Sequence, residues 1–288
     1  MQHRLKLSFL SILFAIVFLF VGISGNGISE SVTDTSFEVH FIDVGQGDCA
    51  LVLCDGQTML IDGGEASQSS KVYAYLKEHG VDHLNFIVAS HAHADHVGGL
   101  SGALNYAIVD VALCPVQDYD TKTFQSFVKY LGQQNIAITI PHTGDIYELG
   151  SATIQILAPL RDYEDPNDTS IVIKVIYGET SFFFTGDATR IAEADILGAG
   201  YDLSATVLKV GHHGSDTSTS YPFLREIMPK YAIISVGKDN EYGHPTDNTL
   251  SRLRDADVQV FRTDQQGTVI CVSDGKTVSF EAEKKDQK

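Results

Sequence analysis

The most constraining feature of this sequence is a group of histidines that directly follows an apolar segment. Residues 84–89 have the length and composition of a buried β-strand, and residues 90–99 follow as a polar loop that ends in two glycines. Imidazole nitrogens and carboxylate oxygens are ligands of zinc, manganese and other divalent ions. Isolated surface side chains rarely cluster in this way, so the loop predicts a metal site at a strand end. The group consists of His91, His93, Asp95 and His96.

The spacing within the loop predicts two metal ions rather than one. His91 and His93 lie two positions apart and can reach one ion from the same side. Asp95 and His96 are adjacent, and adjacent side chains on a tight loop diverge, so this pair is expected to face a second ion. We therefore predict two divalent ions, zinc or manganese.

Two later segments also present polar side chains where an apolar strand ends. Residues 182–187 are an apolar run that ends in Gly-Asp, and Asp187 is expected to project from the strand end. Gly-Asp is also an ordinary turn, so this assignment depends on the histidine loop upstream. Residues 208–215 end in a second such break, where His212 and His213 stand between two glycines. A pair of histidines in an otherwise apolar context indicates a functional site.

The histidine loop, read as His-x-His-x-Asp-His-x-Gly-Gly, resembles the metallo-β-lactamase superfamily of binuclear hydrolases. In that superfamily the aspartate of Thr-Gly-Asp bridges the two metals, which implies this role for Asp187. The resemblance also implies that either His212 or His213 completes the second metal site while the other faces the substrate, and we favour His213 as the ligand. The implied metal ligands are His91, His93, Asp95, His96, Asp187 and His213.

Four further segments resemble the branch of the superfamily that contains the extracellular domain of the competence protein ComEC. The similarity extends over about residues 37–275, but the sequence has one apolar segment where ComEC has a polytopic channel, so a stand-alone domain is expected. The resemblance implies these substrate-binding residues: Asn167, Asp168, Ser170, His212, Asn240 and His244. The similar segments are residues 41–48, 60–64, 167–172 and 240–245.

One departure from the superfamily pattern affects the first metal site. Many members carry another ligand histidine before Thr-Gly-Asp, but here that interval contains only His142, whose surroundings do not match. The first ion is then expected to be held by His91, His93 and Asp187, with a water, a substrate oxygen or Asp168 in addition. Because it has fewer protein ligands, this site should bind its ion more weakly.

The remaining candidate roles concern catalysis and support of the ligands. Asp95 is expected to orient a metal-activated water that attacks phosphorus or a carbonyl carbon, and His212 or His244 is expected to protonate the leaving group. Asp43 and Asp48 could equally be turn residues that cap backbone amides. The aspartates that could hold ligand histidines from behind are Asp43, Asp48 and Asp62.

The N-terminal residues 1–27 predict export. Two basic residues precede the uncharged apolar stretch 7–23, and small residues follow it. The stretch is longer than the usual signal core of about 7–15 residues and shorter than the span of about 20 that crosses a membrane. A cleaved signal peptide and an uncleaved membrane anchor therefore both stay open. The folded domain is expected to be secreted or attached to the outer face of the cytoplasmic membrane.

The formal net charge of −17 excludes a general electrostatic attraction to nucleic acid. A polyanionic substrate would thus depend on the metals for local positive charge. The four cysteines show no zinc-ribbon spacing and stand in apolar contexts, which favours buried thiols.

The periodicity predicts an α/β fold built in two similar halves, in which strands come first and then alternate with helices. Three strands are expected between the halves, at 137–140, 153–157 and 170–177. The resemblance adds the specific architecture, an αββα four-layer sandwich of two mixed β-sheets flanked by helices. This domain is predicted over residues 36–281, with a charged tail at 282–288.

Three functions remain open from the sequence. An exported metal-dependent phosphodiesterase or nuclease acting on DNA is favoured by the ComEC-type segments. A hydrolase of a smaller substrate, such as a phosphorylcholine ester, a lactone or a β-lactam, is favoured mildly by the acidic charge. A non-catalytic domain that binds DNA or a partner is disfavoured by the intact ligand set. The sequence does not predict an oligomeric state.

Overall fold

The computed structural model describes residues 37–284, which form one compact unit. The predicted signal or anchor segment 1–27 and the end of the charged tail lie outside the described residues. Among the helices of residues 37–284, none is both long and apolar enough to cross a membrane.

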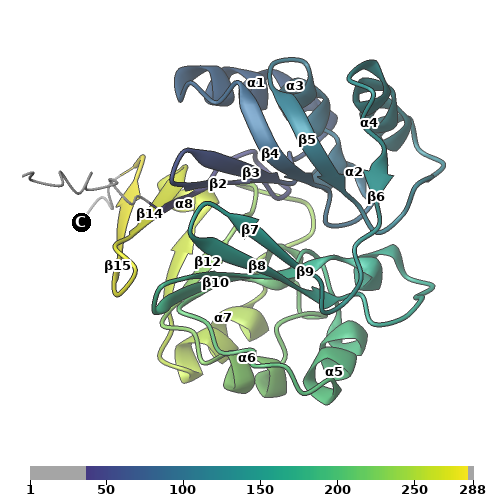
Figure 1. The fold of residues 1–288 in the computed structure, drawn as a ribbon. Coiled ribbons are helices and arrows are strands. Elements are labelled where there is room, and N and C mark those ends of the chain that lie inside the picture. Colours follow the sequence, from purple (N-terminus) through teal and green to yellow (C-terminus); the bar gives the residue numbers. More distant parts are fainter. Residues whose placement is uncertain (1–36, 285–288) are drawn as a thin grey trace, which may run out of the picture. The chain divides into compact units, whose positions relative to one another are not determined.

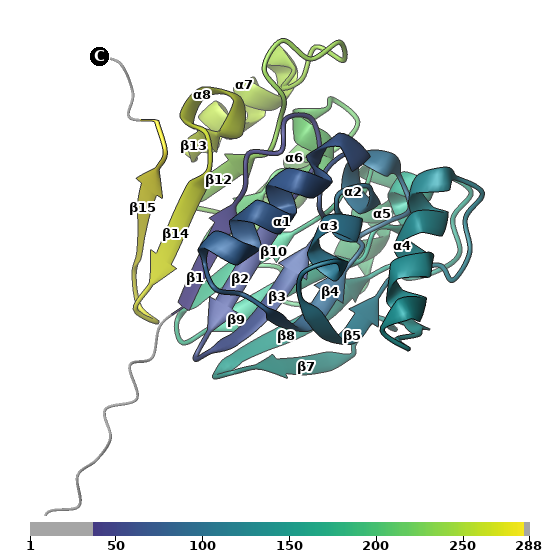
Figure 2. The same ribbon diagram turned by 90° about the horizontal axis from the view of Figure 1, so that it is seen from above.

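The first sheet has eight strands in the order β15-β14-β1-β2-β3-β4-β5-β6. From β15 to β3 neighbouring strands are antiparallel, whereas β3, β4, β5 and β6 run parallel to one another. Figures 1 and 2 show helices α1, α3 and α4 over its outer face. The strands are β1 (Phe37–Phe41), β2 (Ala50–Cys54), β3 (Gln57–Ile61), β4 (His83–Val88), β5 (Ile108–Leu113), β6 (Ile138–Thr139), β14 (Val269–Ser273) and β15 (Val278–Ala282). The helices of this half are η1 (Ala66–Gln68), α1 (Ser69–Glu78), α2 (Ala94–Val97), α3 (Leu100–Leu104) and α4 (Lys122–Gln133).

The second sheet has seven strands in the order β13-β12-β11-β10-β9-β8-β7. Strands β10 to β13 are parallel, and helices α5, α6 and α7 cover the outer face, as Figure 1 shows. The strands are β7 (Ile146–Leu149), β8 (Ala152–Ala158), β9 (Val172–Tyr177), β10 (Thr180–Phe184), β11 (Val207–Lys209), β12 (Tyr231–Ile234) and β13 (Gln259–Arg262). The helices are η2 (Pro166–Thr169), α5 (Arg190–Gly198), η3 (Gly211–Gly214), α6 (Tyr221–Ile227), α7 (Asp247–Asp255) and α8 (Thr263–Gln266).

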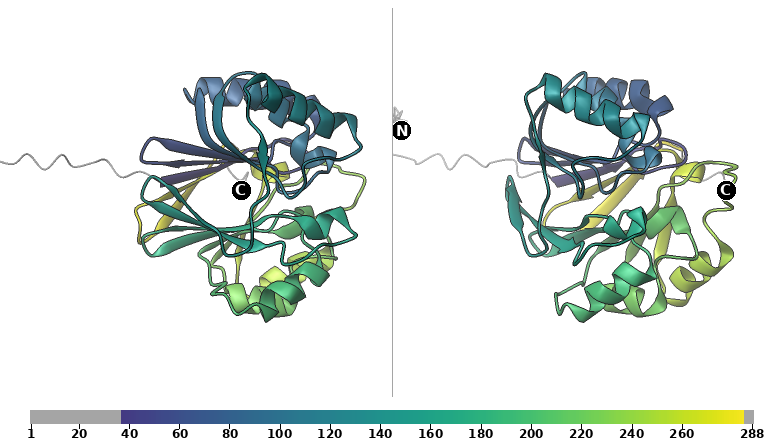
Figure 3. Two further views of the ribbon diagram at one scale, coloured as in Figure 1. Left: turned by 45° about the vertical axis from the view of Figure 1, so that its right-hand side comes forward. Right: turned by 90° about the vertical axis from the view of Figure 1, so that its right-hand side faces the viewer.

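The two sheets pack face to face, and both views of Figure 3 show the helices on the outside. A cluster of buried apolar side chains fills the space between the sheets, where Phe37 stacks on Tyr177 and contacts Phe182. A second apolar cluster lies under the helices of the first half, and a third lies under the helices of the second half. The predicted α/β four-layer sandwich is therefore confirmed. The four cysteines are buried and free, as expected from their apolar contexts.

The strand prediction was incomplete between the two halves. It missed β7, which forms the outer edge of the second sheet and pairs with β8 from Ile146 to Leu149. Three of the four residues in β7 are exposed or half-buried, so the segment lacks the apolar alternation that reveals a strand.

Candidate metal centre

The predicted metal ligands lie on loops that leave the carboxyl ends of parallel strands. Strand β4 leads into the histidine loop, β10 leads to Asp187, and β11 leads to His212 and His213. Strand ends of parallel sheets commonly place polar loops at one shared edge. In this fold the two sheets bring such edges together, so residues far apart in sequence meet.

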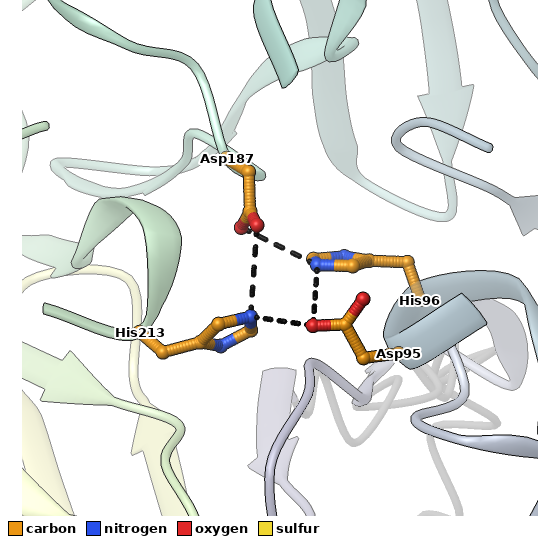
Figure 4. A group of neighbouring side chains, drawn as sticks. All are labelled: Asp95, His96, Asp187 and His213. Carbon is orange, nitrogen blue, oxygen red and sulfur yellow. Dashed lines mark hydrogen bonds and ion pairs between the residues drawn. The ribbon is translucent and has the colours of Figure 1, made fainter. Parts of the chain in front are cut away.

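Four side chains form the candidate metal-binding cluster, as Figure 4 shows. The Nε2 atom of His213 lies 3.2 Å from Asp95 Oδ2 and 3.6 Å from Asp187 Oδ2. The Nε2 atom of His96 lies 3.3 Å from Asp187 Oδ1 and 3.9 Å from Asp95 Oδ2. These four residues each offer one ligand atom within 4.8 Å of the others. Two imidazoles and two carboxylates thus face a common point from both halves of the molecule.

His91 and His93 lie beside this group. The ring of His91 is 4.1 Å from that of His96, centroid to centroid, and 4.8 Å from that of His93. The Nε2 atom of His91 is 4.0 Å from Asp187 Oδ2. The carboxylate of Asp187 therefore faces His91, His96 and His213 at the same time. Asp187 would thus be within reach of an ion held by any of these histidines.

Several inward atoms of the centre have no hydrogen-bond partner within residues 37–284. They are His91 Nε2, His96 Nε2 and Asp187 Oδ1, and all are buried. Buried polar atoms are nearly always satisfied, so an unsatisfied group needs an explanation. Divalent cations bind such nitrogen and oxygen donors. The residues present therefore fit a metal site.

Asp62 holds His96 from behind. The carboxylate of Asp62 accepts hydrogen bonds from His96 Nδ1 at 2.9 Å, from the Ser90 amide at 2.7 Å and from the Ser90 hydroxyl at 2.7 Å. All three residues are buried. A carboxylate on the far ring nitrogen fixes the tautomer that leaves Nε2 free to bind a metal. The structure thus places Asp62 where the sequence prediction put a supporting residue.

Asp48 supports His213 in a similar way. The Nδ1 atom of His213 donates to the Ser235 carbonyl at 3.0 Å and lies 3.1 Å from Asp48 Oδ1. The buried ammonium of Lys209 lies 2.7 Å from Asp48 Oδ2. Of the alternatives left open for Asp48, the structure shows the contact with a candidate ligand. Sequence reasoning missed Lys209, although a lysine inside the apolar strand β11 was the signal for it.

The buried carboxylates control the pKa of the central histidines. Burial alone would lower the pKa of His96, but Asp187, Asp62 and Asp95 outweigh it and raise the pKa well above its usual value. Burial opposes the same effect at His213, where Asp187 and Asp48 raise the pKa to about 10. Metal binding must therefore displace protons from these imidazoles.

A cavity of about 170 Å³ opens onto the centre. His212 faces it with its Nε2 atom 3.5 Å from Asp187 Oδ2, and its side chain is 25% exposed. The ring of His244 lies 5.6 Å from that of His212, and burial, together with His212, lowers the pKa of His244 to about 4. His213 is a buried member of the four-residue group, whereas His212 is partly exposed to the cavity. The cavity is lined by Gln46, His93, Asp95, Asn167, Asp187, His212, His213, Tyr242 and His244.

Three predicted substrate-binding residues are not among those that line this cavity. Asp168 is buried and accepts a hydrogen bond from the Thr189 amide at 2.8 Å. Ser170 is also buried, and its hydroxyl accepts from the Asp187 amide at 3.0 Å. Asn240 bonds to its own loop, where its amide group donates to the carbonyls of Gly237 and His244. Asp168 and Ser170 therefore hold backbone amides, whereas Asn240 holds its own loop and lines a neighbouring groove. Asn167 does line the cavity, and its Oδ1 atom is buried without a hydrogen-bond partner among the described residues.

Asp43 is the second aspartate for which the sequence left two roles open, as a support for a ligand histidine or as a turn residue. Its Oδ1 atom accepts a hydrogen bond from the Gly45 amide at 3.1 Å, which closes a turn. Of the two alternatives given for Asp43, the structure shows the turn. His142 differs from the buried histidines of the centre, because its side chain is 86% exposed and pairs with Asp145.

A sandwich of two mixed sheets with a histidine–aspartate centre at the strand ends defines a class of protein. Residues 42–238 match the family described as the metallo-beta-lactamase superfamily, and the chain belongs to that superfamily. Solved structures share the fold at low identity. The metallo-beta-lactamase fold protein YhfI from Bacillus subtilis is 14% identical with a TM-score of 0.56, over 83% of this chain and 100% of that one. Tm1679, a metal-dependent hydrolase of the beta-lactamase superfamily, is 15% identical with a TM-score of 0.51, over 78% of this chain and 95% of that one.

Comparison with related proteins shows which branch of the superfamily this chain resembles. ComE operon protein 3 of Bacillus subtilis is 30% identical over 251 residues, which cover 81% of this chain and 32% of that protein. Competence protein ComA of Neisseria gonorrhoeae is 30% identical over 244 residues, which cover 83% of this chain and 33% of that protein. The chain therefore spans about a third of the length of these relatives. The predicted similarity to ComEC-type competence proteins is confirmed.

Proposed function

We propose that this protein is an exported, binuclear metal-dependent phosphodiesterase that cleaves DNA. One observation carries the proposal above the others. Asp95, His96, Asp187 and His213 come from both halves of the molecule and direct their ligand atoms at one point beside a small open cavity. A non-catalytic binding domain has no need for such a centre. A pair of bound divalent ions, zinc or manganese, would activate water and offset negative charge on a phosphoryl oxygen.

The side chains around the cavity divide the remaining tasks. Asp95 lines the cavity and contacts His213 through Oδ2, which leaves its other oxygen to orient an attacking water. His212 is the better candidate for the proton donor, because the lowered pKa of His244 keeps the His244 ring neutral near pH 7. Neutral His244 and Asn167 are left to bind the substrate by hydrogen bonds.

The choice of DNA over a smaller ester rests on the relatives. Their names include competence proteins and Recombination protein 2 of Haemophilus influenzae, which is 30% identical over 234 residues. The charge of −17 works against binding a polyanion, so the local groups around the centre must overcome it. A β-lactam is the least favoured of the small substrates, because the predicted first metal site lacks a third histidine.

The proposed location outside the cytoplasmic membrane rests on the sequence of residues 1–27, which lie outside the described structure. Protease added to intact cells should degrade the domain if it is attached to the outer face. A secreted form should appear in the medium with a shortened N-terminus. Protection from protease in intact cells, with no protein in the medium, would contradict export.

Hydrolysis assays on the purified protein test the activity. With manganese or zinc added, the protein should hydrolyse bis-p-nitrophenyl phosphate and cleave DNA, and Asp187→Ala should abolish both reactions. Asp145→Ala, which changes an aspartate on an edge loop next to exposed His142, serves as the matched control. Metal-loaded protein that is inert toward both phosphodiesters would refute the proposal. Activity on a lactone or a phosphorylcholine ester alone would establish the small-ester alternative.

A further inference from the structure

The cavity at the metal centre is too small to enclose a nucleotide. Its volume of about 170 Å³ lies below the range of about 300–1,000 Å³ in which pockets bury a drug-sized ligand. The cavity therefore takes the reacting group, and the rest of the substrate must lie on the neighbouring surface. Two features of that surface adjoin the mouth of the cavity.

The first feature is an exposed aromatic ring. Tyr242 lines the cavity, yet it is 63% exposed. Its ring lies nearly parallel to that of His244, with an interplanar angle of 27° and a centroid distance of 5.8 Å. Single exposed aromatics are common on protein surfaces. This one is backed by a histidine of the centre and leaves its outer face free at the point where a substrate must leave the cavity.

The second feature is a groove of about 430 Å³ that we call the lysine groove. Gln46 lines both this groove and the cavity at the centre, so the two adjoin on either side of one side chain. The side-chain Oε1 atom of Gln46 accepts a hydrogen bond from the Gly237 amide at 3.1 Å, which holds this side chain in place between the groove and the cavity. Three exposed lysines from distant parts of the chain line the groove: Lys71, Lys238 and Lys284.

The ammonium groups of these lysines are not neutralised within residues 37–284. No described carboxylate forms an ion pair with them, and Lys71 donates to the backbone carbonyl of Asp43. Two acidic residues also line the groove. Asp264 pairs with Arg262 at 2.7 Å, whereas the Asp43 carboxylate accepts a hydrogen bond from the Gly45 amide and keeps its charge. Three lysines therefore stand against one unpaired lining carboxylate, so the groove is locally basic in a chain with a net charge of −17.

We infer that Tyr242 and the lysine groove form a track for a single DNA strand that enters the metal centre. A base next to the cleaved bond stacks on Tyr242, and the phosphates that follow it lie along Lys71, Lys238 and Lys284. Stacking platforms combined with a basic groove are the means by which proteins bind single strands without sequence preference. The inference rests on the proposed phosphodiesterase function and names its substrate as a single strand.

Binding to a fluorescent oligothymidylate, measured by anisotropy on the metal-free protein in EDTA, tests the track without relying on catalysis. The triple variant Lys71→Gln/Lys238→Gln/Lys284→Gln removes the charges of the groove. The triple variant Lys122→Gln/Lys230→Gln/Lys276→Gln removes the same charge from exposed lysines elsewhere. Since each phosphate contact on a single strand contributes about 0.7 to the slope of log K against log salt, the groove variant should lower that slope by about 2 relative to the control. Equal slopes and affinities for the two triple variants would overturn the track.

Tyr242 gives a second, uncharged arm. Tyr242→Ala should weaken oligothymidylate binding by about tenfold or more while the salt slope stays unchanged, because stacking involves no counterion release. Tyr242→Phe keeps the ring and should restore the affinity. A duplex cannot present an unstacked base, so it should bind more weakly than the single strand. Equal binding of duplex and single strand, or full affinity in Tyr242→Ala, would overturn the inference.

The failure of this inference differs from failure of the proposed function. Wild-type protein that hydrolyses bis-p-nitrophenyl phosphate with metal but does not bind the oligonucleotide would refute the track alone. Wild-type protein that binds the oligonucleotide through the track but hydrolyses no phosphodiester would refute the proposed function alone.

Discussion

Asp62 illustrates how a single buried carboxylate shapes the centre. It is 1% exposed and accepts three hydrogen bonds, from His96 Nδ1 and from both polar groups of Ser90. Ser90 in turn lies 3.2 Å from the Nδ1 atom of His91 through its hydroxyl. Both candidate ligand histidines therefore depend on one Asp–Ser pair behind them.

Replacing Asp62 by asparagine should weaken metal binding without removing a ligand. The isosteric amide keeps the volume but loses the charge that fixes His96, and loss of such support lowers metal affinity or activity by about 10- to 100-fold. Zinc or manganese affinity measured by competition with a chelator checks this. Asp110→Asn is the matched control, because Asp110 accepts from His83 at 2.9 Å on the exposed surface. Equal metal affinity for the two variants would contradict the role of Asp62.

The histidines of the centre also predict how stability depends on pH. In the metal-free protein the pKa of His213 is raised to about 10, chiefly by Asp187 and Asp48 against the effect of burial. A raised pKa contributes stability that is complete below the unfolded value of about 6.5 and is lost as the pH rises through the folded value. Thermal melts of the EDTA-treated protein should therefore show a falling Tm between about pH 6.5 and pH 10. A flat Tm across this interval would show that His213 is not protonated in the metal-free state.

At the scale of elements, the centre depends on two interlocked loops. The loop after β3 and the loop after β4 touch through their glycines, where the Gly99 amide donates to the Gly64 carbonyl at 2.8 Å. A Cβ atom added at Gly99 would overlap the Gly63 carbonyl oxygen. The Asp-Gly-Gly and His-x-Gly-Gly motifs are therefore two sides of one contact. The sequence displays both motifs but not that they meet.

Gly99→Ala should destabilise the protein by about 1–3 kcal/mol, because overpacking against a backbone atom forces the loops apart. It should also reduce metal affinity, since the displaced loop carries His91 and His96. Gly132→Ala is the control, because Gly132 lies in α4 with nothing within 4 Å of an added Cβ. That change should stabilise the helix by about 0.5–1 kcal/mol. Denaturant unfolding of both variants measures the difference, and similar stability for the two would contradict the interlocked contact.

Some elements of the fold could be predicted from the sequence and others could not. Apolar strands that end in Gly-Asp or Gly-His-His predicted where the chain presents polar groups, and these ends do meet. Asp168, Ser170 and Asn240 could not be distinguished from substrate ligands, because a motif does not show whether its polar side chains face a cavity or a backbone amide. The supporting contact of Lys209 likewise depends on which strand lies next to β11, and this is a property of the folded sheet.

For the molecule as a whole, the centre is a junction between the two halves. Asp95 and His96 follow β4 of the first sheet, whereas Asp187 and His213 follow β10 and β11 of the second. A cation held by all four residues binds only when both sheets are folded and packed together. Metal affinity is thereby coupled to the stability of the entire sandwich.

Metal should therefore raise the Tm of the whole domain in one cooperative transition. Free metal at 100 times its Kd contributes about 2.7 kcal/mol, which corresponds to roughly 5–10 °C for a domain of about 250 residues. Calorimetry with and without manganese or zinc measures the shift, and EDTA should reverse it. In Asp187→Asn the shift should be small, because the carboxylate that faces both His91 and His96 is lost. A wild-type Tm that does not respond to either metal, or a variant that responds equally, would show that the four residues do not hold an ion.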